Sequence, residues 1–296
     1  MYTRSQMKKG SLYITAAALC WSLGGVLIKS VPWSALAISG IRSLFALLVT
    51  LLFSRSFAFR FTKSNILGGL ALSSTAFLFI LSNQYTTAAN AIVLQYSAPL
   101  FIALFSLIFQ RKGISKLDGL GLFVILTGIV LFFFDDLSAG QMLGNILSIL
   151  SGLCFATVFF VNSMPGATPM EATKIGHLIS AIIGIPFAFT ATGATADLGA
   201  WLAVITMGVV QLGLAYVFFS KGTRLVPPLM ASLISCIEPV LNPVWVMLVI
   251  GEVPGFWAFV GMGVVIVGVI VYNTLSARSV EKKQDDVQAG QEQMQD

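Results

Sequence analysis

The chain consists of long apolar stretches separated by short polar segments, and this pattern repeats along almost its whole length. A helix that crosses a membrane needs roughly 17–25 mostly apolar residues, and ten stretches have the required length and character. They cover residues 11–28, 34–53, 66–82, 88–109, 117–134, 143–161, 172–192, 199–219, 228–249 and 254–275. The pattern therefore predicts an all-α membrane protein with ten transmembrane helices.

The composition narrows the class of protein further. Of the 296 residues, 57% are hydrophobic and only 10% are charged, whereas an average soluble domain has about 25% charged residues. A soluble protein of this size could not cover its surface with so few charges, so disordered chains and ordinary cytosolic enzymes are excluded. The three cysteines, Cys20, Cys154 and Cys236, show no disulfide framework or metal-ligand spacing.

The two ends of the chain differ from the apolar part. Residues 1–10 carry three basic side chains before the first apolar stretch, which is too long for the hydrophobic region of a signal peptide and has no cleavage site beyond it. We therefore predict a retained first helix after a short cytoplasmic N-terminus. Residues 276–296 are polar, Gln-rich and mixed in charge, and they predict a disordered cytoplasmic tail.

Lys and Arg residues mark the cytoplasmic side of short membrane loops. If both termini are cytoplasmic, ten spans place all but Lys29 and Arg42 of the 17 Lys and Arg residues on that side. The same topology puts four acidic residues in outer loops, namely Asp135, Asp136, Asp197 and Glu252. The excess of basic over acidic residues thus indicates the orientation in the membrane. It gives no reason to expect a nucleic-acid partner.

The two halves of the chain resemble each other. Related glycines, prolines and cysteines recur at shifts of 140 or 134 positions: Gly68/Gly208, Pro99/Pro239, Gly121/Gly261, Gly128/Gly268, Gly10/Gly144 and Cys20/Cys154. We infer two five-helix repeats, residues 11–134 and 143–275. Because five is odd, the second repeat is inverted in the membrane, an arrangement typical of secondary transporters that work by alternating access.

The segment ASLISCIEPVLNPVWVMLVIGEVPGFWAFVGMGVVIVG, residues 231–268, and its first-half partner at residues 89–128 carry a resemblance to a known family. The chain resembles the ten-helix, EamA-type branch of the drug/metabolite transporter superfamily. That resemblance implies transport of amino acids, nucleotide-related compounds, other metabolites or drugs, and it favours export. Ala98 stands where the second half has Glu238, so any acidic role belongs to one half only.

Few ionisable groups fall inside the predicted spans, where a central charge costs roughly 2.5–3.5 kcal/mol on insertion scales. Glu238 shares a helix face with Ser235 and Asn242. Pro239 frees the carbonyl of Ser235, so we expect this face to line a central cavity. Glu238 is then either a protonatable carboxylate that couples H⁺ to substrate or binds a cation, or a structural carboxylate that fixes a helix.

Arg42 and His177 are the other two ionisable candidates. Arg42 lies on a small, polar face with Ser39, and it either holds a substrate carboxylate or serves the structure by pairing with Glu238 or capping a carbonyl. His177, the only histidine, falls within one residue of the repeat position equivalent to Arg42. It is either a titrating group in the cavity or a satisfied buried donor.

Aromatic and amide side chains complete the set of candidates for substrate binding or coupling, because such pockets are mostly apolar with a few convergent polar groups. They are Trp21, Gln95, Tyr96, Phe155, Gln211 and Tyr216, with Asn242 beside Glu238.

The chain lacks a P-loop, a complete dinucleotide-binding loop, a G-x-S-x-G elbow and an H-E-x-x-H motif. We therefore expect no catalytic residues, metal or cofactor, and no enzymatic activity. The expected protein is a multi-pass transporter of the cytoplasmic (inner) cell membrane, with a small-molecule substrate, the lipid bilayer and optionally protons as partners. The alternatives are a passive channel or facilitator and a membrane protein that transports nothing.

Overall fold

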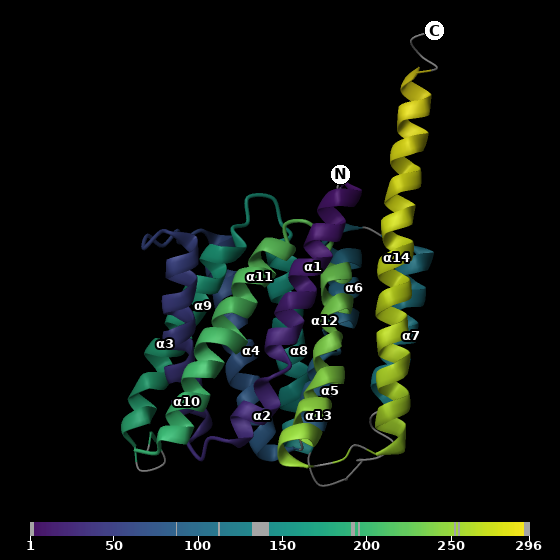
Figure 1. The fold of residues 1–296 in the computed structure, drawn as a ribbon. Helices are drawn as coiled ribbons and strands as arrows, with labels where there is room; N and C mark the ends of the chain where they lie inside the picture. The colour runs from purple at the N-terminus through teal and green to yellow at the C-terminus, as the bar shows by residue number, and fades with distance from the viewer. Residues whose placement is uncertain are drawn as a thin grey trace.

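In a computed structural model that describes residues 3–86, 88–111, 113–131, 142–190, 193–194, 196–251, 253 and 255–292, all regular elements of those residues are helices (Figure 1). The first half contains α1 (Arg4–Trp21), α2 (Gly24–Lys29), α3 (Ala35–Ser54), α4 (Lys63–Tyr85), α5 (Ala88–Gln95), α6 (Ala98–Gln110) and α7 (Lys116–Leu131). The second half contains α8 (Met142–Asn162), α9 (Pro169–Gly184), η2 (Ile185–Phe189), α10 (Leu198–Thr206), η3 (Met207–Leu214), α11 (Ala215–Gly222), α12 (Pro228–Ser235), α13 (Ile237–Ile250) and α14 (Phe256–Glu292).

Each of the ten predicted stretches overlaps one helical segment, and several segments are built from two or three of these elements. By length and composition, eight helices of the described chain can cross a membrane. The other two stretches correspond to α5–α6, of which α6 is apolar but short, and to α7. Asp135, Asp136 and Glu252, predicted in outer loops, lie outside the described residues.

Polar residues fix where several helices begin. The side chains of Thr3, Ser34, Thr62 and Asp197 accept hydrogen bonds from backbone N–H groups in the first turns of α1, α3, α4 and α10. These groups have no partner within the helix. The short polar segments of the sequence thus supply the N-caps of the apolar helices.

The two halves are packed directly against each other. Helix α4 lies against α8 and α9, α3 against α9, and α1 against α11, while α7 and α14 pair at one side of the bundle (Figure 1). The crossing of α3 and α9 is close enough that a Cβ on Gly184 would lie 2.5 Å from the Cα of Gly40. Glycine at both positions therefore allows the two helices to touch backbone to backbone.

The outer surface of the bundle is apolar. Large side chains such as Leu52, Phe123, Ile182 and Val267 are 71%, 69%, 64% and 60% exposed. Monomeric soluble proteins rarely expose such extensive apolar surface, whereas a membrane protein presents it to lipid. This surface agrees with the hydropathy pattern.

The start of α1 and the C-terminal part of α14 lie at the same end of the bundle in Figure 1. Helix α1 already begins at Arg4, so most of the predicted N-terminal segment is helical. At the other end, α14 continues without interruption to Glu292, so the structure differs from the predicted disorder of residues 276–292. That segment is rich in Glu, Lys, Gln and Ala, which favour helix, and it extends a helix that is already nucleated.

Candidate functional site

Three helical segments are interrupted, two of them near the middle and one near its end. The interruptions separate α1 from α2 at Ser22–Leu23, α5 from α6 at Tyr96–Ser97, and α12 from α13 at Cys236. The ends of each helix piece leave backbone groups unpaired, which membrane proteins tolerate where protein or a water-filled cavity surrounds them. The interruptions therefore mark the part of the bundle where polar chemistry is possible.

Two of the interruptions have the same cause in both halves. Pro99 and Pro239 stand in the first turns of α6 and α13, 140 positions apart. A proline ring clashes with the carbonyl four residues earlier, and those residues, Gln95 and Ser235, are the last ones of α5 and α12. The repeat predicted from the sequence is thus visible in the backbone at this point.

A small cavity of about 50 Å³ lies beside these interruptions and is lined by residues of both halves. It brings together seven of the predicted candidates, Trp21, Arg42, Gln95, Phe155, Gln211, Tyr216 and Glu238. The remaining lining residues are Thr75, Ala76, Phe79 and Leu212. Arg42 and Glu238, which helical spacing placed on interior faces, therefore meet at one place in the fold.

Glu238 is in the first turn of α13 and is 8% exposed. Its carboxylate accepts a hydrogen bond from the hydroxyl of Tyr96, at the interruption between α5 and α6. Tyr96 does not itself line the cavity, and its ring is 1% exposed. The contact joins the interrupted helices of the two halves and fixes the carboxylate at the cavity wall.

Arg42 is 2% exposed on α3 and lines the same cavity as Glu238. Its buried Nε has no hydrogen-bond partner, and no ion pair joins Arg42 to Glu238 among the residues that the structure describes. A buried charge without a partner is strongly unfavourable. The guanidinium is therefore available to an anionic group that enters the cavity.

His177 is buried on α9 but does not line the cavity. Its ring packs edge-on against Tyr216, with 5.3 Å between ring centroids, and neither ring nitrogen has a hydrogen-bond partner in the described part of the chain. His177 and Arg42 therefore do not line the same cavity, although the repeat places them at nearly equivalent positions. His177 instead supports a tyrosine that does line the cavity.

The amide candidates occupy different surroundings. Gln95 lines the cavity and donates from Nε2 to Ser151 Oγ over 2.8 Å, and Ser151 in turn donates to the carbonyl of Thr75 over 3.0 Å. Gln211 also lines the cavity, and its buried Oε1 lacks a partner among the described residues. Asn242 does not line it, because its side chain packs against Gly25 of α2.

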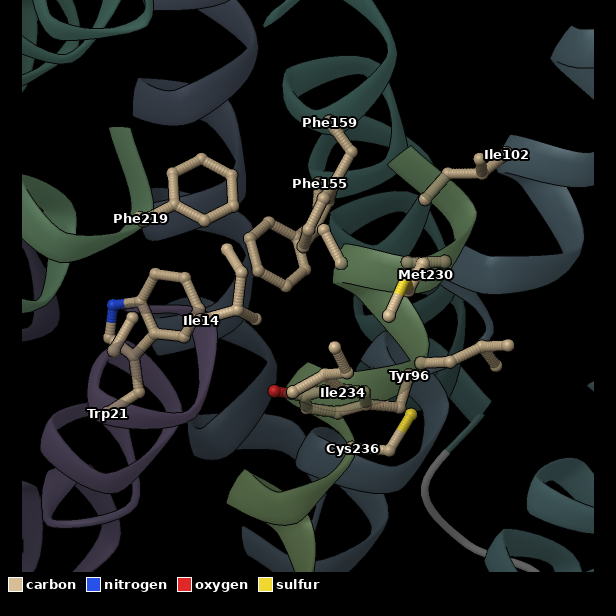
Figure 2. Close-up of a cluster of buried hydrophobic side chains, with 14 of the residues drawn as sticks. Ile14, Trp21, Tyr96, Ile102, Phe155, Phe159, Phe219, Met230, Ile234 and Cys236 are labelled. Carbon is tan, nitrogen blue, oxygen red and sulfur yellow. The ribbon is translucent and has the colours of Figure 1, made fainter. Parts of the chain in front are cut away.

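An aromatic cluster borders the cavity (Figure 2). The ring of Trp21 lies 5.7 Å from Phe155 and 5.4 Å from Phe219, and Phe159 lies 4.9 Å from Phe219. Phe159 and Phe219 are fully buried. They follow Phe155 and Tyr216 along α8 and α11 toward the end of the bundle where α1 begins. The cluster therefore lies between the cavity and that end of the bundle.

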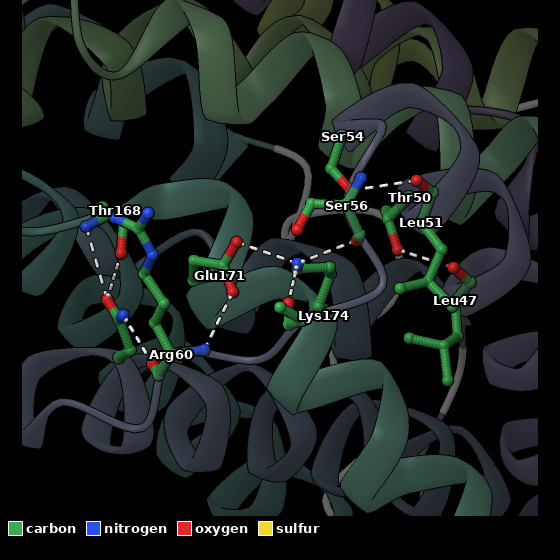
Figure 3. Close-up of polar contacts among 11 residues, drawn as sticks. Leu47, Thr50, Leu51, Ser54, Ser56, Arg60, Thr168, Glu171 and Lys174 are labelled. Carbon is green, nitrogen blue, oxygen red and sulfur yellow. Dashed lines mark hydrogen bonds and ion pairs between the residues drawn. The ribbon is translucent and has the colours of Figure 1, made fainter.

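A polar cluster around Lys174 connects the two halves at the end of the bundle where α1 begins (Figure 3). The fully buried Lys174 of α9 forms an ion pair of 2.8 Å with Glu171 and donates to the carbonyls of Ser56 and Ala58, at 3.3 and 2.7 Å. Glu171 also accepts from the backbone N–H of Arg60, at 3.1 Å. These bonds fix the segment between α3 and α4 onto the start of α9.

Sequence reasoning did not single out the α4 residues Thr75, Ala76 and Phe79, which line the cavity. The repeat held a usable signal for one of them, because the shift of 140 positions pairs Ala76 with Tyr216. It offered no such signal for Lys174, which was counted only among the basic residues on the cytoplasmic side and is buried.

The sequence model of the EamA-like transporter family matches residues 8–134 and again residues 142–274. The chain belongs to the EamA-like transporter family. This confirms the resemblance stated from the sequence, and it makes the chain a multi-pass membrane transporter rather than an enzyme. The two matches also show that the halves are related to each other.

Relatives of this transporter are distant. An uncharacterized transporter of Archaeoglobus fulgidus is 26% identical over 270 residues, which are 90% of this chain and 96% of that protein. The threonine/homoserine exporter RhtA of Salmonella typhimurium is 28% identical over 234 residues, 73% of this chain and 74% of RhtA. A solved crystal structure shares the fold, with a TM-score of 0.75 over 92% of this chain and 99% of that chain at 17% identity.

Proposed function

We propose that this EamA-like transporter is a secondary transporter that carries small zwitterionic solutes of the amino-acid type by alternating access. The observation that carries the proposal is the presence of Arg42 and Glu238 on one buried cavity, without an ion pair between them. Two unlike charges held apart in this way are complementary to a ligand with a carboxylate and an ammonium group.

The roles follow from the geometry of the two side chains. Arg42 presents a planar fork that matches a carboxylate in a bidentate way. Glu238, oriented by the Tyr96 hydroxyl, offers a carboxylate oxygen to an ammonium group or to a proton. The rings of Trp21 and Tyr216 give the rest of the solute apolar contact. Glu238 can thus hold substrate and proton in turn, which provides a route to proton coupling.

The relatives support the substrate class and the direction. RhtA is named as an exporter of threonine and homoserine, and both compounds carry a carboxylate and an ammonium group on one carbon. Its similarity to this chain spans most of both proteins. We therefore propose that this transporter exports a related zwitterion from the cytoplasm.

The proposed topology has ten spans, two inverted repeats at residues 11–134 and 143–275, and both termini in the cytoplasm of a cell with the protein in its inner membrane. It is supported by the clustering of Lys and Arg residues and by the common position of the start of α1 and the C-terminal part of α14 (Figure 1). The aromatic cluster and the Lys174 contacts then lie on the cytoplasmic side of the cavity.

The cavity volume bears on the transport cycle. Small-molecule sites usually occupy about 300–1,000 Å³, whereas this cavity holds about 50 Å³. A solute of amino-acid size therefore requires the two halves to move apart. We propose that the structure corresponds to a contracted state, closed toward the cytoplasm by Phe159 and Phe219.

Counterflow in proteoliposomes tests the proposal. Liposomes containing the purified transporter are loaded with unlabelled L-threonine and diluted into buffer with a trace of labelled threonine. We expect transient accumulation of label, competition by other neutral amino acids, and little competition by threonine amide, which lacks the carboxylate. Equilibration without accumulation would indicate a channel or facilitator, and no movement of any zwitterion would contradict the proposed substrate class.

A further inference from the structure

A second, larger cavity is lined by residues of α1 and α14. Helix α1 begins, and the C-terminal part of α14 lies, at the same end of the bundle (Figure 1). The volume of this cavity is about 470 Å³, and the described residues that line it include Lys8 and Arg278, with no acidic residue among them. It is separate from the cavity of Glu238, with which it shares no described lining residue. Basic side chains from two helices around one hollow form a site for an anionic group.

Polar groups at the base of this cavity join its two walls. Ser11 Oγ donates to Asn273 Oδ1 over 3.0 Å and so connects α1 to α14. Ser11 is 6% exposed and Asn273 is partly buried, and both line the cavity. The bond fixes the spacing of the two helices below the basic residues. The cavity is therefore a feature of the helix packing rather than of mobile surface side chains alone.

The depth of the basic residues corresponds to the membrane interface. Arg278 lies two positions beyond the apolar stretch of α14, Phe259–Ser276, and Lys8 lies near the start of the first apolar helix. Leu12 lines the cavity one turn deeper than Lys8 and is 69% exposed. Leu19 and Val271 continue the same helix faces toward the membrane centre and are 46% and 48% exposed.

We propose that this cavity binds the phosphate headgroup of an anionic phospholipid, with the acyl chains along the apolar surface of α1 and α14. Basic pockets between membrane helices recognise anionic headgroups in this manner. A free phosphate ion has the same charge chemistry, but it makes no use of the exposed apolar residues directly below the cations. The proposal requires only that the protein lies in a membrane, and it is independent of the transported solute.

Lipid binding to the full-length protein in detergent tests the site. Dioleoyl phosphatidylglycerol or dioleoyl phosphatidylcholine is added, and bound lipid is counted by native mass spectrometry. The variant Lys8→Gln/Arg278→Gln is compared with Lys9→Gln/Arg224→Gln, which removes two exposed charges that do not line the cavity. The unfolding temperature of each variant without added lipid shows whether its fold is intact.

We expect the wild-type protein to retain phosphatidylglycerol in preference to phosphatidylcholine. A basic residue near an anionic lipid contributes roughly fivefold to affinity, so Lys8→Gln/Arg278→Gln should weaken phosphatidylglycerol binding by about 20-fold. The control variant should stay within about twofold of the wild type. Equal losses in both variants, or no loss in either, would overturn the proposal.

A third arm separates lipid from free phosphate. Inorganic phosphate in large molar excess should leave the bound phosphatidylglycerol in place. Displacement of the lipid by inorganic phosphate, with a dependence on Lys8 and Arg278, would assign the cavity to a soluble anion and overturn the lipid assignment. Because no arm measures transport, failure here is distinguishable from failure of the proposed function.

Discussion

The hydroxyl of Tyr96 donates a hydrogen bond to the carboxylate of Glu238, across 142 positions of sequence and from one half of the transporter to the other. Each residue stands where a membrane helix is interrupted ahead of a proline, Pro99 or Pro239. The contact therefore links the equivalent helix interruptions of the two repeats. A motion that separates the halves must either break this hydrogen bond or carry both helices together.

Tyr96→Phe tests that link. A hydrogen bond to a charged group contributes about 1.5–3 kcal/mol, so loss of the bond that orients Glu238 toward the ammonium group should lower the counterflow rate at low solute concentration by roughly tenfold or more without unfolding the protein. Counterflow rates in proteoliposomes measure the effect. The matched control is Tyr272→Phe, which removes a hydrogen bond of 2.6 Å to Asp118 outside the cavity. Equal rates for the two variants would refute a specific role for Tyr96.

Glu238→Gln tests proton coupling. The amide keeps the shape of the side chain but cannot take up or release a proton, so a pH gradient should no longer stimulate transport. Solute fluxes with and without an imposed pH gradient provide the measurement. Glu171→Gln, which alters a carboxylate at the Lys174 cluster, should retain the response to pH. A normal pH response in Glu238→Gln would mean that coupling does not involve this residue.

Arg42→Lys tests recognition of the solute carboxylate. Lysine keeps the positive charge but loses the bidentate fork, so KM for the zwitterion should rise by about tenfold. Arg42→Gln should bind the zwitterion and its amide about equally, because the charge that distinguishes them is gone. Competition assays compare the two compounds. Continued discrimination against the amide by Arg42→Gln would place the carboxylate elsewhere.

Phe219→Ala tests the closure of the cavity by the aromatic cluster. Truncation of a buried phenylalanine costs about 3–5 kcal/mol, so the unfolding temperature in detergent should fall, and the solute should leak down its gradient faster. The control Phe123→Ala removes a ring that is 69% exposed on α7 and should change little. An unchanged unfolding temperature and an unchanged solute leak in Phe219→Ala would show that this ring does not close the pathway.

Cysteine labelling tests the proposed orientation. In a protein with Cys20, Cys154 and Cys236 replaced by serine, Arg60→Cys should react only with a reagent that reaches the cytoplasm. Ala196→Cys, at an exposed position two residues before α10, should react with an impermeant reagent from outside, because α10 begins at the opposite end of the bundle (Figure 1). The reverse labelling pattern would invert the topology and move the aromatic cluster to the outer side of the cavity.

Local sequence patterns predicted much of this architecture because each depends on neighbouring residues only. The length of an apolar stretch predicts a span, and the helical repeat of about 3.6 residues predicts which side of the helix is buried. Arg42 and Glu238 could thus be placed on interior faces before any helix was placed in space. The same reasoning failed for the tail, since helix formation beyond Ser276 depends on the helix that precedes it.

The sequence alone therefore determined the membrane class of this protein, the approximate positions of its helices, its internal repeat and some of the side chains turned inward. Only the tertiary structure decided which of those side chains meet. It brought Tyr96 to Glu238, kept Arg42 apart from Glu238, set His177 behind Tyr216, and buried Lys174 under a loop of the other half. The physical reason is that helix periodicity is a local property, whereas the partners of an inward side chain depend on how helices distant in sequence cross and pack.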